Sequence, residues 1–312
     1  MQTALGRENL SISHSAFATP SSASSTLLDS EPTVSDSNQT GSEACTWKLT
    51  LAYDGTDFHG WQVQPGKPTI QGELQAALGR VTGESPLPQG SGRTDTGVHA
   101  IAQVASFPLA APIPAANLLR ALNRTLPASI RVSAAETVQN GFHARHSAVA
   151  KTYEYRILQA GDCSPFLARY VYLYPWPLNL VALQQSAQLF LGEHDFRSFA
   201  ASDPDLTARS LDLPDAGAPR IPPQSTVRTI FASEWSRHDT PDGRQLVYRV
   251  RGNGFLHHMV RNLVGTMLDA GRGHLAASAI PAILARRNRS EAGPTAPARG
   301  LFLHSVEYDR TD

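Results

Sequence analysis

Gly92-Arg93-Thr94-Asp95-Thr96-Gly97-Val98-His99-Ala100 is a short stretch that combines several reactive side chains. Its nine residues include one carboxylate, one guanidinium, one imidazole and two glycines. The glycines allow positive φ angles and a close approach of the backbone to a ligand. We therefore expect a tight loop that presents Asp95, with Arg93 near enough to keep the carboxyl group ionised. An ionised aspartate on a loop is what covalent catalysis at a sugar carbon requires.

The same residues also fit an ordinary β-turn, in which Asp95 bonds its own backbone and Arg93 is solvated. The order of the residues favours a functional loop, because Gly-Arg-Thr-Asp-x-Gly-Val-His-Ala resembles the signature of the tRNA pseudouridine synthase A family. Four further segments resemble the same family and follow in the expected order. They are residues 53–62, 142–145 together with Tyr153, 253–262, and 300–303.

The spacing of apolar residues predicts an alternation of strands and helices. Strands are expected at 47–53, 104–107, 130–138, 150–157, 227–235, 246–251 and 301–308. Helices are expected from a Thr69 cap through Val81, from Pro114 through Leu122, at 178–191, and at 255–271 with Gly271 as the C-cap. This order indicates an α+β protein with one extended mixed sheet. The resemblance implies the pseudouridine synthase fold, in which helices flank a mixed, mostly antiparallel sheet built from two pseudo-symmetric halves.

The chain of 312 residues is long enough for one large domain or two small ones. Residues 1–45 are rich in serine and threonine without an apolar period, and we expect a disordered leader there. Residues 46–158 are expected to form the N-terminal half of a catalytic domain, with the Asp95 loop. Residues 159–312 are expected to form the C-terminal half, including a surface insertion at 200–226 that is rich in Pro, Asp and Ala.

Charge and cysteine content limit the classes of protein that fit. The leader holds one of the 27 basic and five of the 27 acidic residues, so the remainder carries 26 basic against 22 acidic groups. A mildly basic body is compatible with a nucleic-acid partner. Cys45 and Cys163 lie far apart without a metal-type spacing, which fits a reducing compartment. With no apolar run of membrane-spanning length and no signal-peptide pattern, we expect a cytoplasmic protein.

The resemblance implies the reaction and its partners. The family isomerises uridine to pseudouridine in the anticodon stem-loop of tRNA, at positions 38, 39 and 40. The N1–C1′ bond of the nucleotide is replaced by a C5–C1′ bond, so nothing is oxidised and no cofactor is expected. The target uridine must leave the base stack before a carboxylate can reach it. The resemblance also implies a homodimer in which the tRNA contacts both subunits.

The resemblance also implies roles for five residues of this chain. Asp95 acts at C1′ of the ribose or at C6 of the base, and the sequence does not choose between these atoms. Arg93 holds the extruded nucleotide by stacking or by phosphate contacts. Arg261 pairs with Asp95 and lowers its pKa. Tyr153 stacks on the extruded uracil and Leu301 lies against it, although both residue types most often simply pack in a core.

His257 and His258 are potential metal ligands, but the sequence argues against a metal site. Adjacent histidines on a helix point in different directions, and no third ligand stands at a useful spacing. We therefore expect no metal. The same helix would place Arg261 four residues after His257, on the same face.

Two other functions fit parts of the pattern. A non-catalytic RNA-binding module would use the same sheet and basic residues, but a carboxylate facing phosphates would weaken its affinity. A nucleoside hydrolase would use Asp95 as a covalent nucleophile, but it usually needs a second acid, and no paired carboxylate stands beside Asp95.

Overall fold

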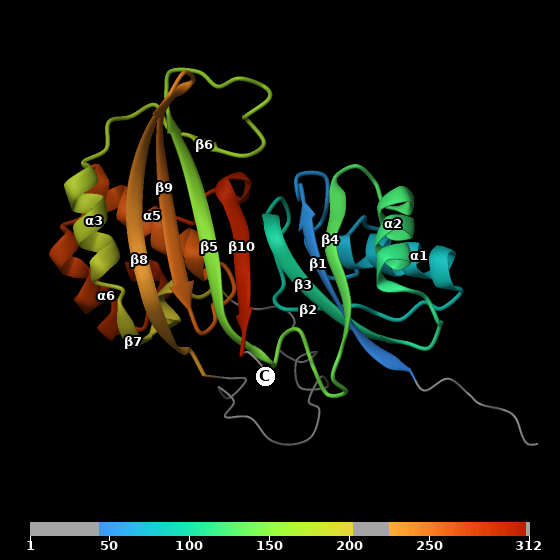
Figure 1. The fold of residues 1–312 in the computed structure, drawn as a ribbon. Coiled ribbons are helices and arrows are strands. Elements are labelled where there is room, and N and C mark those ends of the chain that lie inside the picture. Colours follow the sequence, from blue (N-terminus) through green and yellow to red (C-terminus); the bar gives the residue numbers. More distant parts are fainter. Residues whose placement is uncertain (1–43, 202–224, 310–312) are drawn as a thin grey trace, which may run out of the picture. The chain divides into compact units, whose positions relative to one another are not determined.

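A computed structural model describes residues 44–201 and 225–309 (Figure 1). These residues belong to one compact unit that begins at Ser42. The expected leader at 1–45 lies outside the described residues except for its last two positions. The expected insertion at 200–226 likewise lies outside them except for its ends.

The first part of the chain forms five strands and two helices. They are β1 (Cys45–Tyr53), α1 (Ile70–Thr82), β2 (Gln89–Gly90), β3 (His99–Leu109), α2 (Ala115–Thr125), β4 (Ile130–Val138) and β5 (Ala148–Gln159). In β1 every second side chain is buried, which is the alternation expected of a strand with one face on the core. Helix α1 begins after Thr69, whose hydroxyl accepts a hydrogen bond from the Gly72 N–H.

Within the described ranges, the second part forms five strands and three helices. They are β6 (Tyr172–Leu173), α3 (Leu180–Gln188), β7 (Gly192–Asp195), β8 (Val227–Thr240), β9 (Gly243–Gly252), α5 (Met259–Gly271), α6 (Ile280–Arg286) and β10 (Leu301–Tyr308). Short 3₁₀ turns occupy Phe196–Phe199, Ala277–Ala279, Arg289–Glu291 and Ala298–Gly300. Among the described residues, none of the helices is both long and apolar enough to cross a membrane.

The ten strands of the described residues form one sheet, and β10 lies at its centre. The main order is β4-β1-β3-β10-β5-β9-β8-β7, with β2 paired to β3 and β6 to β5. Strand β10 pairs with β3 in parallel through two residue pairs, Phe302 with His99 and Leu303 with Ala100. It pairs with β5 in the antiparallel sense along most of its length. The predicted α+β class with a mixed, mostly antiparallel sheet is confirmed.

The helices lie beside the strands of their own part of the chain. Helices α1 and α2 accompany β1, β3 and β4, whereas α3, α5 and α6 accompany β8 and β9 (Figure 1). Helix α5 is buried along most of its length, including Leu263, Val264 and Met267. This burial anchors the start of α5, which carries Arg261, to the hydrophobic core.

Most predicted elements are confirmed, some with changed ends. The strands predicted at 130–138 and 301–308 have the bounds of β4 and β10. The prediction that a helix begins at 255 is wrong, because α5 begins at Met259. Its N-cap, His258, has a φ of 58°, a left-handed conformation that cannot continue a right-handed helix. The C-cap is Arg272, and Gly271 is the last helical residue.

Candidate active site

The loop between β2 and β3 presents Asp95, and its neighbour Thr94 is held on two sides. The Thr94 hydroxyl lies 2.9 Å from the Tyr53 hydroxyl in a buried contact. The Thr94 carbonyl accepts a hydrogen bond of 3.0 Å from the Trp61 N–H. A Cβ at Gly60 would lie 2.5 Å from that carbonyl oxygen, so the close approach requires glycine. The loop is therefore fixed to the segment that follows β1.

The residues before Asp95 are anchored from β3 and β5. Lys151 in β5 donates a hydrogen bond to the Ser91 carbonyl. Gln103 in β3 donates one of 2.8 Å to the Gly92 carbonyl and accepts one of 2.6 Å from the Ser91 hydroxyl. Of the two loop glycines, Gly97 has a positive φ of 77° and Gly92 does not. The carbonyls of Ser91 and Gly92 are hydrogen-bonded to Lys151 of β5 and Gln103 of β3. The loop that carries Asp95 is therefore held in a defined position.

Three basic side chains from the far part of the chain surround the Asp95 carboxylate. His257 Nε2 lies 3.4 Å from Oδ1, and His258 Nε2 lies 3.3 Å from Oδ2. Arg261 Nη1 donates a hydrogen bond of 3.2 Å to Oδ2. The Asp95 side chain is 22% exposed, so the carboxylate is partly shielded while still accessible to a substrate.

These neighbours decide the charge of Asp95. Burial favours the neutral acid and would raise its pKa. The hydrogen bond with His257 and the charges of His258, His257 and Arg261 act in the opposite direction and outweigh burial. The pKa of Asp95 is therefore lowered from its usual value, and the group is a carboxylate at neutral pH.

Arg261 is held in place by a reciprocal contact with the loop before β10. Its Nε donates a hydrogen bond of 2.7 Å to the Ala296 carbonyl, and the Ala296 N–H donates one of 3.1 Å to the Arg261 carbonyl. The guanidinium thus contacts Asp95 with one nitrogen and the backbone with another. This geometry fixes the direction from which the charge of Arg261 acts on the carboxylate.

The two histidines do not point in different directions as predicted. Both precede α5, and the left-handed backbone at His258 brings their rings to a centroid separation of 4.0 Å. Both Nε2 atoms face Asp95. Its carboxylate is the third potential metal ligand, which the spacing along the sequence did not indicate. The three donor atoms lie within 4.8 Å of one another. The predicted helical face shared by His257 and Arg261 is also wrong, because His257 is not helical.

Tyr153 lies in β5 close to this carboxylate. Its side chain is 8% exposed, and its ring meets the edge of Phe255 at a centroid distance of 5.0 Å. Burial raises the pKa of Tyr153, and the charges of Tyr53 and Asp95 raise it further, so the phenol stays neutral. Leu301 is buried at the start of β10, opposite Tyr155 in the sheet register. Arg93 lines a surface pocket beside the loop, together with Trp61 and Arg145.

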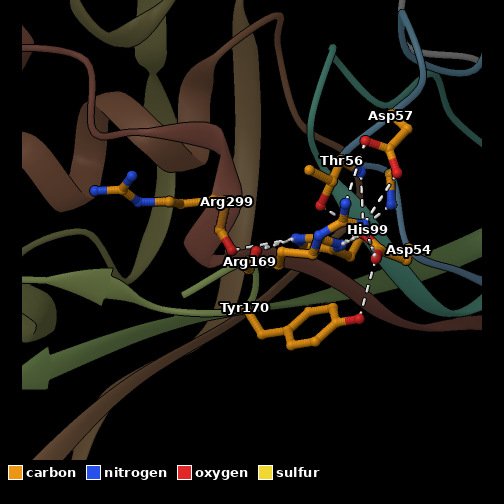
Figure 2. Close-up of polar contacts among 8 residues, drawn as sticks. Asp54, Thr56, Asp57, His99, Arg169, Tyr170 and Arg299 are labelled. Carbon is orange, nitrogen blue, oxygen red and sulfur yellow. Dashed lines mark hydrogen bonds and ion pairs between the residues drawn. The ribbon is translucent and has the colours of Figure 1, made fainter. Parts of the chain in front are cut away.

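A second polar cluster lies at the other end of the signature, around His99 (Figure 2). His99 is 1% exposed, and its Nδ1 accepts a hydrogen bond of 3.1 Å from the Gly55 N–H. Its Nε2 lies 2.9 Å from the Arg169 carbonyl, and its ring stacks on Phe302 at 4.7 Å. Asp54 accepts hydrogen bonds from the Arg169 guanidinium, at 3.1 Å, and from the Tyr170 hydroxyl, at 3.0 Å.

This cluster connects segments that are distant in sequence. It joins the loop after β1, the start of β3 and the loop before β6 (Figure 2). The stacking of His99 on Phe302 adds strand β10. His99, Asp54 and Phe302 belong to segments that the sequence analysis selected, whereas Arg169 and Tyr170 do not. Because Asp54 and Arg169 are 115 residues apart, no local pattern indicates their contact.

Comparison with known proteins agrees with the geometry. A family model described as tRNA pseudouridine synthase matches residues 50–147 and 186–309. A tRNA pseudouridine synthase A of Solibacter usitatus is 52% identical over 262 residues, covering 84% of this chain and 98% of that protein. One of Moorella thermoacetica is 44% identical over 263 residues, with the same coverage. One of Bacillus subtilis is 40% identical over 264 residues.

Proposed function

Since the chain belongs to the tRNA pseudouridine synthase family, we propose that Asp95 is the nucleophile with which it isomerises uridine to pseudouridine in tRNA. The protein is accordingly an isomerase. The observation that carries the role of Asp95 is its ionised, half-shielded carboxylate, held by Arg261, His257 and His258. The proposed substrate positions are uridines 38, 39 and 40 of the anticodon stem-loop.

The reaction moves a ribose from one atom of uracil to another. The N1–C1′ bond breaks, the C5–C1′ bond forms, C5 loses a proton and N1 gains one. Asp95 acts by addition at C1′, by promoting elimination of the base, or by addition at C6. In each case the carboxylate must be charged and aimed, and both conditions follow from its basic neighbours. We assign no cofactor to this reaction, because the atoms balance within the nucleotide.

The neighbouring residues have supporting roles in this proposal. Tyr153 and Leu301 confine the detached uracil while it turns, in a pocket from which water is largely excluded. Arg93 holds the extruded nucleotide, since its guanidinium can stack on a base or bind a phosphate. Arg261 keeps Asp95 ionised and oriented.

The geometry favours this function over the two alternatives. Within the described ranges, the cluster of potential metal ligands around Asp95 contains two histidines and no second carboxyl group, whereas a retaining hydrolase places one about 5 Å from the nucleophile. A binding module gains nothing from a carboxylate in an RNA groove, because the negative charge repels phosphates. Three basic groups arranged around one carboxylate are instead suited to catalysis.

The decisive experiment compares the natural protein with Asp95→Asn on unmodified tRNA transcripts. Carbodiimide-blocked primer extension should show new stops in the anticodon arm with the natural protein and none with Asp95→Asn. Asp95→Asn should bind the tRNA at least as well, because a negative charge has been removed. Asp239→Asn, at an exposed residue on the β8–β9 hairpin, is the matched control and should remain active. Release of free uracil instead of pseudouridine would support the hydrolase.

We further propose that the protein acts as a homodimer in the cytoplasm, as the family resemblance implies. Light scattering coupled to gel filtration tests the dimer directly. A mass of one chain at the concentrations used for catalysis would contradict it.

A further inference from the structure

A surface pocket lies beside the Asp95 loop, and its lining is basic and polar. Its lining consists of Trp61, Gln62, Gln71, Leu87, Gln89, Gly90, Arg93, His143, Arg145 and His146. Its charged or ionisable members are Arg93, Arg145, His143 and His146. None of the lining residues is acidic; the others are amides, a tryptophan, a leucine and a glycine. Such a lining favours an anion that also accepts hydrogen bonds.

One wall of the pocket is a turn with a fixed backbone. The Ala144 N–H donates a hydrogen bond of 2.9 Å to the Ser106 hydroxyl of β3. The Arg145 N–H donates one of 3.1 Å to His143 Nδ1, and the Ser147 N–H donates one of 2.9 Å to the His143 carbonyl. The base of the Arg145 side chain is therefore held in place before any ligand binds, which reduces the entropy lost on binding.

The opposite wall is continuous with the candidate active site. Arg93 precedes Asp95 by two residues, so their Cα atoms are at most about 7 Å apart. Trp61 also lines the pocket, and its backbone N–H donates a hydrogen bond of 3.0 Å to the Thr94 carbonyl. The pocket therefore borders the loop that presents Asp95.

A lysine behind this wall adds to the basic groups near the pocket. Lys151 donates a hydrogen bond to the Ser91 carbonyl, two residues before Arg93. Burial, and then the charges of Arg145 and Arg228, lower the pKa of Lys151 to about 7. Like charges brought this close repel one another, and a bound anion would relieve the repulsion.

We propose that this pocket binds a backbone phosphate of the tRNA strand that carries the target uridine, with Arg93 and Arg145 as its main ligands. Guanidinium groups bind phosphate oxygens through two parallel hydrogen bonds, and two of them from different segments fix the position of the strand. The proposal rests on the proposed function, because it assumes that tRNA is the substrate. It assigns Arg145 to binding and leaves the chemistry to Asp95.

Arg145→Gln tests this assignment in the full-length protein. The dissociation constant for an unmodified tRNA transcript should rise about tenfold at low salt, since one charge-assisted contact is lost. The slope of log Kd against log salt concentration should fall by about one, as expected for one phosphate contact. At saturating tRNA, kcat should stay within about twofold, because Arg145 does not contact the reacting atoms. Arg237→Gln removes an exposed arginine of the β8–β9 hairpin that pairs with Asp239, and should change neither quantity.

The outcomes separate this proposal from the proposed function. If the natural protein forms pseudouridine but Arg145→Gln keeps its affinity and salt slope, the pocket proposal is overturned and the function stands. If the natural protein binds tRNA without forming pseudouridine, the function fails, and the salt slopes still decide whether a phosphate is bound. Arg145→Lys guards against misfolding, since it retains the charge. It should keep the salt slope but lose affinity, and an unchanged affinity would count against bidentate binding.

Discussion

At the scale of single residues, the surroundings of Asp95 separate what the sequence could predict from what it could not. The residues around Asp95 also fit a plain turn, and it was the resemblance of their order to a family signature that identified Asp95. The orientation of His257 and His258 was predicted wrongly, because apolar periodicity extends the helix backwards through 255–258. The left-handed residue His258 sets the N-terminal limit of that helix, and a periodic pattern of apolar residues does not encode this conformation.

Arg261→Gln should lower kcat about 100-fold, because the carboxylate loses both a nearby positive charge and its orientation. The affinity for tRNA should change little if Arg261 acts through Asp95. Single-turnover assays with excess enzyme would measure the chemical step, and filter binding would measure affinity. A loss of affinity that accounts for the whole loss of activity would instead make Arg261 an RNA-binding residue.

Zinc should inhibit the enzyme, because two imidazoles and a carboxylate within 4.8 Å are suitable ligands for it. A bound ion would occupy the carboxylate oxygens that the reaction needs. Activity should fall more than tenfold at saturating zinc and return with a chelator, while His258→Gln should be much less sensitive. Equal inhibition of both proteins would place the zinc elsewhere.

At the scale of elements, local signals predicted the elements better than their ends. The alternation in β1 and the Thr69 cap of α1 are local features, and both predictions hold in the structure. The polar cluster around Asp54 and His99 is different, because it depends on a loop that lies 115 residues away in sequence. It holds the start of β3 against the loop before β6 (Figure 2). Through the stacking of His99 on Phe302 it also holds β3 against β10.

The pH dependence of stability should reveal that cluster. Burial acts to raise the pKa of Asp54, but hydrogen bonds from Thr56, Arg169 and Tyr170 outweigh it and lower the pKa from 3.8 to about 2. A lowered folded-state pKa means that the ionised group stabilises the protein above about pH 4, and that this contribution is lost as pH falls towards 2.

Asp54→Asn should therefore lower the melting temperature by several degrees at pH 7, and the difference should shrink below about pH 4. Thermal melts followed by circular dichroism from pH 7 to pH 3 would measure it. Asp57→Asn is the matched control, because Asp57 contacts the same Arg169 but is largely exposed, and its loss should cost less. A difference that stays constant with pH would mean that the charge of Asp54 is not the cause.

At the scale of the whole molecule, the order of strands could not be read from periodicity. Each strand pattern predicts one buried face but not the neighbour, and the pairing of β10 with β3 joins residues about 200 positions apart. The class of fold was still predictable, because the resemblance to a known family supplied what the local patterns lack. The division into halves at 158 and 159 stays a prediction.

A chain that lacks residues 1–41 should keep its kcat/KM for tRNA within about twofold. The reason is that the relatives match over 98% of their own length but only 84% of this chain, so they catalyse the reaction with fewer residues. The same primer-extension assay, run as a time course, would measure it. A loss of more than about tenfold with an unchanged melting temperature would give these residues a role in catalysis or binding.

The central place of β10 has a consequence for synthesis of the protein. Within the described residues, every other strand is translated before it, yet it alone lies between β3 and β5. A nascent chain can form pieces of the sheet on either side, but Asp95 and the residues that surround it stay unjoined until β10 emerges. Termination before Leu301, the first residue of β10, should therefore yield inert polypeptide rather than a weakened catalyst.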